Sequence, residues 1–541
     1  MNRATAALTA SAHVDTFARD HLPPAGLWPE LLFELPELQY PARLNCVAEL
    51  LDRAVREGDG ARVAIRGEHL TWTYAELGAQ VDRIANVLRR DMGLVPGNRV
   101  LLRGANCPMM AAAILAVFKA GCVAVPTMPL LRARELGIIM EKAQVNAVLC
   151  AAPLRAEMEA APNRPSQLCW FDDAGSLDSL EVRMSAQPAS FEACDTAADD
   201  VCLISFTSGT TGVPKGTMHF HRDILAICDC FPRHTLRSEA SDLFIGTPPL
   251  AFTFGLGGLL LFPLRARAGT VLLEKLTPET LLQAIERYRA TVCFTAPTFY
   301  RQMAALAPKF DLASLRKTVS AGEALPVATR ESWQQATGLR MIDGIGATEM
   351  LHIFISAADE DIRSGATGKP VPGYRACILD AEGQPCPPGV IGRLAVKGPT
   401  GCRYLNDERQ RDYVFEGWNL TGDAYEMDAD GYFIYRSRTD DMIISAGYNI
   451  AGPEVEDALL RHPAVAECGV VGKPDEERGQ VVAAHVVLKA GHEPSPELAA
   501  ALQEFVKQQI APYKYPRAVQ FHAALPRTET GKLQRFKLRT A

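Results

Sequence analysis

The chain has 541 residues, enough for three or four structural units at roughly 150 residues each. Its 56 Lys and Arg residues against 63 Asp and Glu residues give a formal net charge of −7, which argues against a nucleic acid as main partner. Hydrophobic residues make up 48% and charged residues 22%, proportions that exclude a disordered or fibrous protein.

The first half of the chain alternates between helical and strand patterns after an irregular start. Residues 1–45 are interpreted as an arm lying on the body of the protein. Thr73 and Glu76 have the spacing of a capping box, and apolar residues at helical period predict a helix through residue 88. Such alternation predicts βαβ units and parallel sheets flanked by helices. The other elements expected here are strands over 99–103, 122–126 and 146–150, and a helix over 111–119.

The second half continues this pattern and then changes. A helix over 281–288 and strands over 291–295, 315–320 and 340–344 are expected. Near residue 370, Gly and Pro become frequent and predict a small antiparallel β unit. The last hundred residues are long enough for a core of their own, with helices over 453–461 and 497–508 and strands over 465–471 and 481–488. We expect an arm over 1–45, a large domain over 46–437, a hinge over 438–440 and a small domain over 441–541.

The cysteines and the apolar segments indicate the compartment. The 14 cysteines include no CxxC pair, which is typical of reduced, mostly buried thiols. The most apolar stretch, 111–126, contains Lys119 and is too short to span a bilayer. We expect a cytoplasmic protein that does not bind membranes and is a monomer or a homodimer.

The sharpest local signal lies in residues 207–217, directly after an apolar strand pattern. These eleven residues supply five hydroxyls, three glycines and one lysine. Glycines let backbone N–H groups turn toward an anion, and hydroxyls donate to phosphate oxygens. The order Lys-Gly-Thr differs from that of the Walker A loop. The predicted phosphate-binding residues are Thr207, Ser208, Gly209, Thr210, Thr211, Gly212 and Lys215.

Five segments, in this order, resemble the signature motifs of the acyl-adenylating superfamily, which includes acyl-CoA synthetases, luciferases and peptide-synthetase adenylation domains. The segments are 205–216, 344–349, 421–423, 435–441 and 526–532. The resemblance implies an α/β fold whose large domain, built of parallel αβ subdomains and a small β unit, is followed by a small mobile α+β domain. It also implies Mg²⁺ as a cofactor and ATP and coenzyme A as co-substrates.

The resemblance implies a role for each motif residue. Lys532 would bridge the substrate carboxylate and the α-phosphate, Thr348 would donate to that phosphate, and Glu349 would hold Mg²⁺. Asp423 and Arg438 would bind the ribose, Asp440 would be the hinge, and Ala446 and Gly447 would line a pantetheine tunnel. Adenine would lie among Gly322, Glu323, Asp343, Gly344 and Ile345, the last of these standing where many members have an aromatic ring. Ser437 stands where the family often has glycine.

Three segments indicate the acid. Residues 343–356 and 252–257 resemble benzoate-CoA ligases, and on that match the acid pocket is lined by Phe254, Gly346, His352 and Ile353. The Thr253 hydroxyl lies where a polar ring substituent is plausible, because burying a hydroxyl unpaired costs about 1–3 kcal/mol. Residues 13–24 resemble the leader of 2-aminobenzoate-CoA ligases. We therefore expect an aryl-CoA ligase that favours 2-aminobenzoate, with benzoate second.

Three alternatives remain open. One is a stand-alone aryl adenylating enzyme, which would load a carrier-protein thiol and would not require CoA. A non-catalytic adenylate-binding scaffold is disfavoured by the presence of Lys532, Glu349, Thr348 and Asp423. A kinase-type NTPase would release ADP rather than AMP, and the order of the phosphate loop speaks against it.

Overall fold

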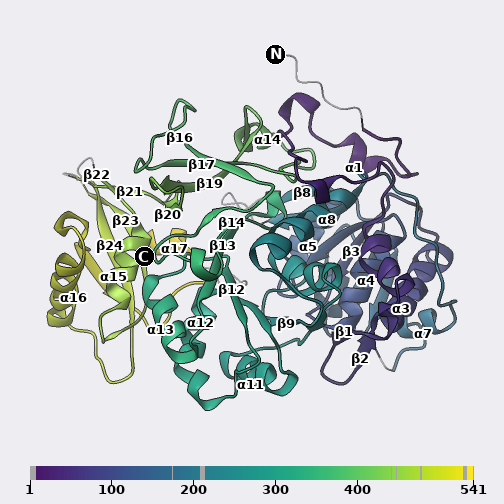
Figure 1. Ribbon diagram of the computed structural model, residues 1–541, viewed down its shortest axis with the longest axis horizontal. Coiled ribbons are helices and arrows are strands. Elements are labelled where there is room, and N and C mark those ends of the chain that lie inside the picture. The colour runs from purple at the N-terminus through teal and green to yellow at the C-terminus, as the bar shows by residue number, and fades with distance from the viewer. Residues whose placement is uncertain are drawn as a thin grey trace.

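The computed structural model describes residues 8–173, 175–207, 214–439, 441–445, 448–475, 478–527 and 533–539. Within these residues, the strands form four sheets, two of them large and mainly parallel and two of them small and mainly antiparallel. In Figure 1 the large sheets occupy the right and centre, one small sheet lies above them, and the C-terminal sheet lies at the left. The predicted fold class, an α/β protein with a small C-terminal α+β domain, is confirmed.

The six-stranded sheet has the order β6-β5-β3-β4-β7-β8, parallel except where β8 pairs antiparallel with β7. The predicted capping box is present, because Thr73 and Glu76 exchange hydrogen bonds at the start of helix α3. The strands are β3 (Arg99–Arg103), β4 (Val123–Thr127), β5 (Ala147–Ala151), β6 (Gln167–Phe171), β7 (Val201–Thr207) and β8 (Lys215–Phe220), with helices α3 (Tyr74–Asn86), α4 (Pro108–Lys119), α5 (Ala133–Ala143) and α8 (His221–Cys230).

The nine-stranded sheet has the order β15-β14-β13-β12-β11-β9-β10-β1-β2, and its six inner strands from β13 to β1 run parallel. The sheet contains the predicted strands at 291–295, 315–320 and 340–344. Its strands are β1 (Val63–Arg66), β2 (Thr71–Thr73), β9 (Leu243–Gly246), β10 (Gly269–Val271), β11 (Val292–Thr295), β12 (Lys317–Ala321), β13 (Met341–Gly346), β14 (Ile353–Ser356) and β15 (Lys369–Pro370), with helices α9 (Thr253–Leu256), α11 (Pro278–Tyr288), α12 (Pro297–Leu306) and α13 (Val327–Thr337).

The predicted antiparallel β unit after residue 370 is also present. It consists of β16 (Arg375–Leu379), β17 (Gly392–Lys397), β18 (Val414–Phe415), β19 (Trp418–Met427) and β20 (Phe433–Arg438).

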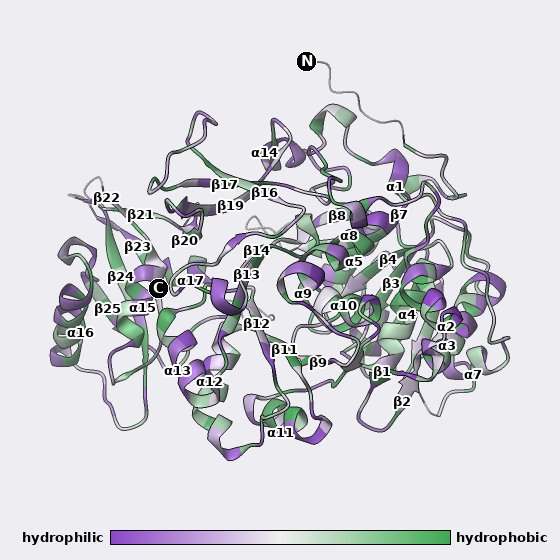
Figure 2. Ribbon diagram, in the orientation of Figure 1, coloured by the Kyte–Doolittle hydropathy of each residue, from purple (hydrophilic) through white to green (hydrophobic). Residues whose placement is uncertain are grey.

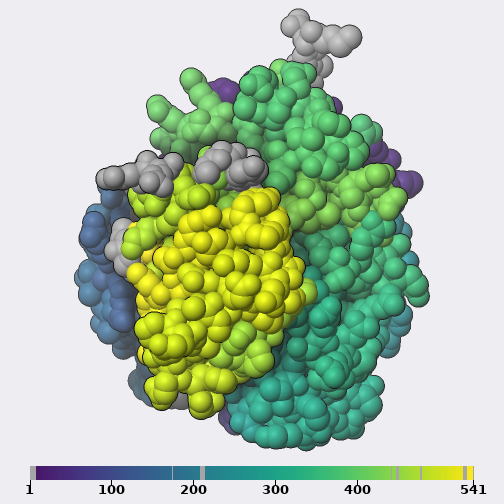
Figure 3. Space-filling model, turned by 90° about the vertical axis from the view of Figure 1, so that its left-hand side faces the viewer, coloured from purple at the N-terminus to yellow at the C-terminus, as the bar shows by residue number. Residues whose placement is uncertain are grey.

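The C-terminal sheet has the order β22-β21-β24-β23, with β25 paired to β24. Strand β23 extends beyond the predicted 465–471, because it continues pairing with β24 up to the contact of Asp475 with Gly479. In the space-filling view this part forms a compact yellow lobe against the teal and green surface (Figure 3). Its elements are β21 (Ile443–Ser445), β22 (Tyr448–Ile450), β23 (Val465–Asp475), β24 (Gly479–Leu488), β25 (Ala518–Phe521), α15 (Gly452–Leu460), α16 (Pro496–Gln509) and α17 (Arg535–Arg539).

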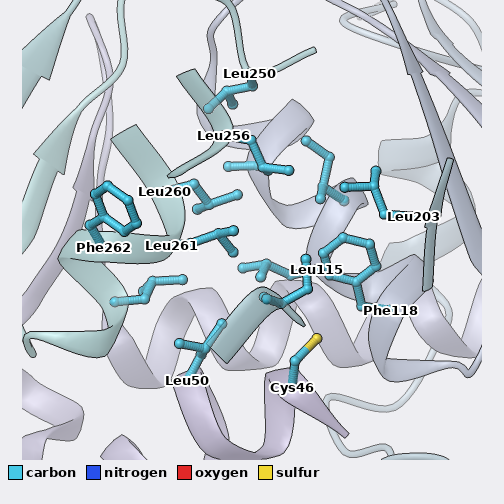
Figure 4. Packing of buried hydrophobic residues seen from close by; sticks show 14 of the residues in the cluster. Cys46, Leu50, Leu115, Phe118, Leu203, Leu250, Leu256, Leu260, Leu261 and Phe262 are labelled. Atoms are coloured by element: carbon cyan, nitrogen blue, oxygen red, sulfur yellow. The ribbon is translucent and has the colours of Figure 1, made fainter. Parts of the chain in front are cut away.

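The main hydrophobic core joins the two large sheets. Leu50, Leu115 and Phe118 meet Leu256 and Leu260 in this core, as Figure 4 shows. Figure 2 shows hydrophobic residues along β3, β4 and α4, whereas peripheral helices such as α14 (Gln410–Tyr413) are more hydrophilic. The burial of these strands explains why their sequences are continuous apolar runs rather than alternating ones.

The N-terminal segment packs on this body. Asp200, which directly precedes strand β7, accepts hydrogen bonds from Ser11, the Ala12 amide and Arg19. All 14 cysteines are free, and most are buried, as predicted. In the part of the chain that the structure describes, no helix is long and apolar enough to cross a membrane.

Candidate active site

The predicted phosphate loop connects the antiparallel strands β7 and β8. Thr207 ends β7 and Lys215 begins β8, whereas Ser208, Gly209, Thr210, Thr211 and Gly212 lie outside the described residues. The Thr207 hydroxyl is buried, and no described residue forms a hydrogen bond with it. A donor group of this kind at the mouth of the loop is suited to a phosphate oxygen.

Lys215 lies beside the predicted metal-binding carboxylate. Its Nζ donates to the Tyr404 hydroxyl at 2.8 Å and lies 3.7 Å from Oε1 of Glu349. The Tyr404 hydroxyl in turn donates to the same Glu349 oxygen. Burial, followed by the charge of Glu349, raises the pKa of Tyr404, so the phenol keeps its proton. Sequence reasoning missed Tyr404, because no local pattern distinguishes it.

Thr348 and Glu349 lie on a short 3₁₀ turn, Thr348–Met350, which follows strand β13. We call it the Thr348 turn. Glu349 is buried, and its two contacts with Lys215 and Tyr404 both involve Oε1. The other carboxylate oxygen is therefore left for a further ligand.

The two predicted adenine-binding segments lie at the carboxyl ends of the neighbouring parallel strands β12 and β13. Gly322 and Glu323 directly follow β12, and residues 343–345 lie near the end of β13. Gly322 has φ +90°, a conformation that favours glycine, and the next residue, Glu323, accepts a hydrogen bond from Thr298 at 2.5 Å. Burial raises the pKa of the Asp343 carboxyl to about 6, against the opposing charge of Arg330. A Cβ on Gly344 would lie 2.7 Å from the Ile353 side chain, so this position requires glycine.

The predicted ribose-binding residues form an ion pair across strands β19 and β20. Asp423 is paired in register with Arg438, whose guanidinium lies 3.1 Å from the carboxylate. A Cβ on Gly422, which has φ +76°, would lie 2.6 Å from that guanidinium. The glycine thus leaves room for the arginine, and the structure brings these two predicted residues together.

The predicted acid-binding residues gather around an aromatic cluster at helix α9. The ring of His352 lies 5.7 Å from that of Phe254 and 4.4 Å from that of Phe262, measured between ring centroids. A Cβ on Gly257 would lie 2.4 Å from the His352 ring, so the helix approaches this close only because glycine is there. Thr253 and Ile353 are buried, and Gly346 is exposed at the end of β13.

The protonation state of His352 follows from its surroundings. Nε2 lies 3.3 Å from the Phe254 carbonyl oxygen, which can only accept, so Nε2 carries the proton. Burial lowers the pKa of His352 to about 3, so the ring is neutral near pH 7. Nδ1 is then an acceptor, and it is buried without a hydrogen-bond partner among the residues that the structure describes.

The predicted residues of the C-terminal part are described only in part. Lys532, Asp440, Ala446 and Gly447 lie outside the described residues. Arg527, from the same motif as Lys532, lies 3.4 Å from Glu323 and also pairs with Glu467 of β23. The motif thus reaches the segment predicted to contact adenine.

The contact of Lys215 with the buried Glu349, the Asp423–Arg438 pair and the hydroxyl-rich sequence after β7 together make a residue set that suits a nucleoside triphosphate. The chain belongs to the AMP-binding enzyme family, the acyl-adenylating superfamily that the motifs resemble. The model of the AMP-binding enzyme family matches residues 51–404, and that of its C-terminal domain matches residues 454–532.

Similar proteins cover nearly the whole chain. The benzoate–CoA ligase of Thauera aromatica is 36% identical over 518 residues, which are 94% of this chain and 98% of that protein. The crystal structure of the anthranilate CoA ligase AuaEII in complex with anthranoyl-AMP has a TM-score of 0.88 at 33% identity and covers 94% of this chain and 98% of its own. A benzoate CoA ligase from Burkholderia xenovorans LB400 has a TM-score of 0.84 at 32% identity, over 92% of this chain and all of that chain.

Proposed function

We propose that this AMP-forming acid–CoA ligase acts on aromatic acids and prefers 2-aminobenzoate, with benzoate second. The acid carboxylate attacks the α-phosphorus of ATP, giving aryl-AMP and pyrophosphate. The CoA thiol then displaces AMP and gives the aryl-CoA thioester. The similarity to proteins named benzoate–CoA ligase and anthranilate CoA ligase supports the aromatic substrate class.

The unpartnered Nδ1 of His352 is the observation that carries the choice of acid. A buried acceptor without a donor costs about 1–3 kcal/mol, and an amino group on the ring of the acid would supply that donor. Thr253 adds a hydroxyl group to the same region, at the start of α9. Benzoate offers no such donor and would leave Nδ1 unpaired, so it ranks second.

The phosphates of ATP would be bound by the Thr348 hydroxyl and by Lys215. Glu349 fits a magnesium ion, because Mg²⁺ takes one or two carboxylates together with phosphates and the contacts of Glu349 with Lys215 and Tyr404 use only one of its two oxygens. When bound, the ion would neutralise phosphate charge. Lys215 would then exchange its hydrogen bond to the Tyr404 hydroxyl for one to a phosphate oxygen.

The first test is product analysis. The protein is incubated with ATP, Mg²⁺ and benzoate, 2-aminobenzoate, 2- or 4-hydroxybenzoate, 2-fluorobenzoate, phenylacetate or a fatty acid, each with and without CoA. We expect AMP and aryl-CoA, formed most efficiently from 2-aminobenzoate. Aryl-AMP without a thioester would instead favour the loading of a carrier-protein thiol, and turnover of fatty acids alone would contradict the aromatic assignment.

The variant His352→Phe tests the acid assignment directly. It keeps an aromatic ring but replaces the Nδ1 acceptor by a C–H group. We expect the ratio of kcat/KM for 2-aminobenzoate to that for benzoate to fall roughly 5- to 100-fold, the range of an unpaired buried group. Benzoate is the matched control, because it lacks only the amino group. An unchanged ratio would show that His352 does not bind the amino group of the acid.

A further inference from the structure

His219, which no motif singled out, lies directly behind the Thr348 turn. It is the fifth residue of β8, its side chain is fully buried, and its Nε2 donates to the Thr348 carbonyl oxygen at 2.8 Å. The same oxygen accepts the Leu351 amide at 3.1 Å. Both hydrogen-bonding positions of this carbonyl are therefore used, one within the turn and one from the neighbouring strand.

Two more side chains fix the other residues of the turn. Tyr404 donates to the Glu349 carboxylate, and the Thr400 hydroxyl donates to the Met350 carbonyl at 2.7 Å. Tyr374 donates to Thr400 in turn, at 3.1 Å. Three consecutive residues of the turn are thus each held by a buried side chain.

The backbone that follows the turn is strained. Leu351 has φ +69°, in a region that residues with a side chain rarely adopt. Such conformations cost about 1–3 kcal/mol and persist where the surroundings fix them, often at functional sites. The hydrogen bonds from His219 and Thr400 hold two carbonyls, those of Thr348 and Met350, directly before this residue.

Behind the His219 ring lies the buried ion pair of Asp223 and Arg403, whereas Nδ1 of the ring has no hydrogen-bond partner among the described residues. This Nδ1 lies 3.8 Å from Asp223, which accepts the Phe220 amide at 3.0 Å and Arg403 at 2.7 Å. Arg403 is fully buried, and its backbone carbonyl accepts the Met218 amide at 2.8 Å. Strand β8 and the segment 400–405 therefore form one rigid support.

We propose that His219 is a positioning residue: by hydrogen-bonding the Thr348 carbonyl, it sets the turn that presents the Thr348 hydroxyl and the Glu349 carboxylate to the phosphates of ATP. The proposal rests on the adenylation half of the proposed function and is independent of which acid is used. Misplacing catalytic groups by about 1 Å can cost on the order of 10²-fold in rate, so a small shift of the turn has a large effect.

The test compares variants that keep or remove the donor. His219→Gln retains an N–H group near the position of Nε2, and His219→Leu removes it at similar volume. Thr400→Val removes the second donor. Thr270→Val is the matched control, because Thr270 is also buried and donates to a carbonyl, that of Phe244, away from the site. ATP–pyrophosphate exchange is measured with the acid that the wild type uses best, alongside the melting temperature.

We expect His219→Leu to lower the exchange kcat about 10- to 100-fold while KM for ATP changes less than about threefold. His219→Gln should retain at least a third of the activity, Thr400→Val should lose less than His219→Leu, and Thr270→Val should match the wild type. Should His219→Leu not fold, His219→Asn replaces it, because its shorter amide cannot reach the carbonyl. Exchange within twofold of wild type, or equal loss in the Gln and Leu variants, would overturn the proposal.

A second readout needs no acid. Hydrogen exchange of the peptide spanning residues 347–352, followed by mass spectrometry, should be faster in His219→Leu than in His219→Gln or the wild type. Unchanged exchange in this peptide would also overturn the proposal. A wild type that activates no acid would contradict the proposed function, and the hydrogen-exchange result would still decide the role of His219.

Discussion

The Thr348 turn and the segment before Lys532 meet the same candidate site in different ways. The turn is held by fully buried side chains from β8 and from residues 400–404, whereas Arg527 approaches Glu323 with 27% of its side chain exposed. Hydrogen bonds between buried groups are costly to break, and partly exposed ion pairs contribute only about 0–1 kcal/mol. This difference suits a site in which the phosphate-binding side stays fixed and the C-terminal part exchanges positions between two half-reactions.

Disrupting the buried ion pair behind the Thr348 turn should produce the largest effect. Arg403→Met leaves the Asp223 carboxylate buried without its guanidinium partner, which costs about 3–5 kcal/mol of unfolding free energy. Urea unfolding at pH 7 measures this loss. Arg375→Met is the control, because Arg375 pairs with Glu34 at the exposed surface and should change the unfolding free energy by less than about 0.5 kcal/mol.

The loss of unfolding free energy in Arg403→Met should depend on pH, because it arises from the Asp223–Arg403 pair. Burial alone would raise the pKa of Asp223, but the charge of Arg403, together with contacts from His219 and Arg222, outweighs burial and holds that pKa below its usual range. The stabilisation is therefore fully present above the unfolded pKa, about 4, and is lost as pH falls through the folded pKa. The difference between wild type and Arg403→Met should shrink below pH 4, and a constant difference would contradict this account.

Replacing Lys532, the lysine expected to act in adenylation, should separate the two half-reactions. We expect Lys532→Ala to lower adenylation from the free acid on the order of 10²- to 10³-fold, the loss typical of removing one group that stabilises transition-state charge. Thioester formation from supplied aryl-AMP should stay within a few fold. Single-turnover assays of each step measure the two rates. An equal fall in both would show that the two sides do not act separately.

We expect Asp343 to make the binding of ATP depend on pH. Because burial raises its pKa to about 6, the carboxylate that would accept the adenine amino group becomes protonated below that pH. KM for ATP should then rise, up to about tenfold at pH 5 if only the ionised form binds. Asp343→Asn should show no such rise, because the amide oxygen accepts at every pH. A wild-type KM that is flat between pH 5 and 7 would exclude Asp343 from nucleotide binding.

Much of this fold was predictable because its signals are local. The strand at 99–103 matches β3, and the Thr73–Glu76 capping box is present, since both depend on neighbouring residues only. The fixation of the Thr348 turn was not predictable in this way. His219 and Thr400 act on residues 129 and 50 positions away, and nothing near either one in the sequence indicates that contact. The resemblance pointed to motif residues such as Glu349, but it did not point to the side chains that contact the Thr348 turn.

The acid pocket offers a smaller test on the fixed side. Thr253→Ala removes a buried hydroxyl at the start of α9. We expect the preference for 2-aminobenzoate over benzoate, measured as the ratio of kcat/KM values, to fall roughly fivefold, since one hydrogen bond contributes about 1 kcal/mol. Thr247→Ala is a control, because its hydroxyl pairs with Thr295 at the end of β9. If the two variants change the ratio equally, Thr253 has no specific role.

The ion pair of Arg527 with Glu323 should give the smallest effect and bears directly on the contrast between the two sides. Because the pair is partly exposed, Arg527→Ala should cost about 0.2–1 kcal/mol, or up to about fivefold in adenylation, and leave thioester formation from aryl-AMP unchanged. The loss should fade at high salt, since screening already weakens the pair in the wild type. Arg527→Lys should recover part of the rate at low salt. A loss that persists in 1 M salt would mean that Arg527 acts through packing, and the C-terminal contact would then resemble the fixed side.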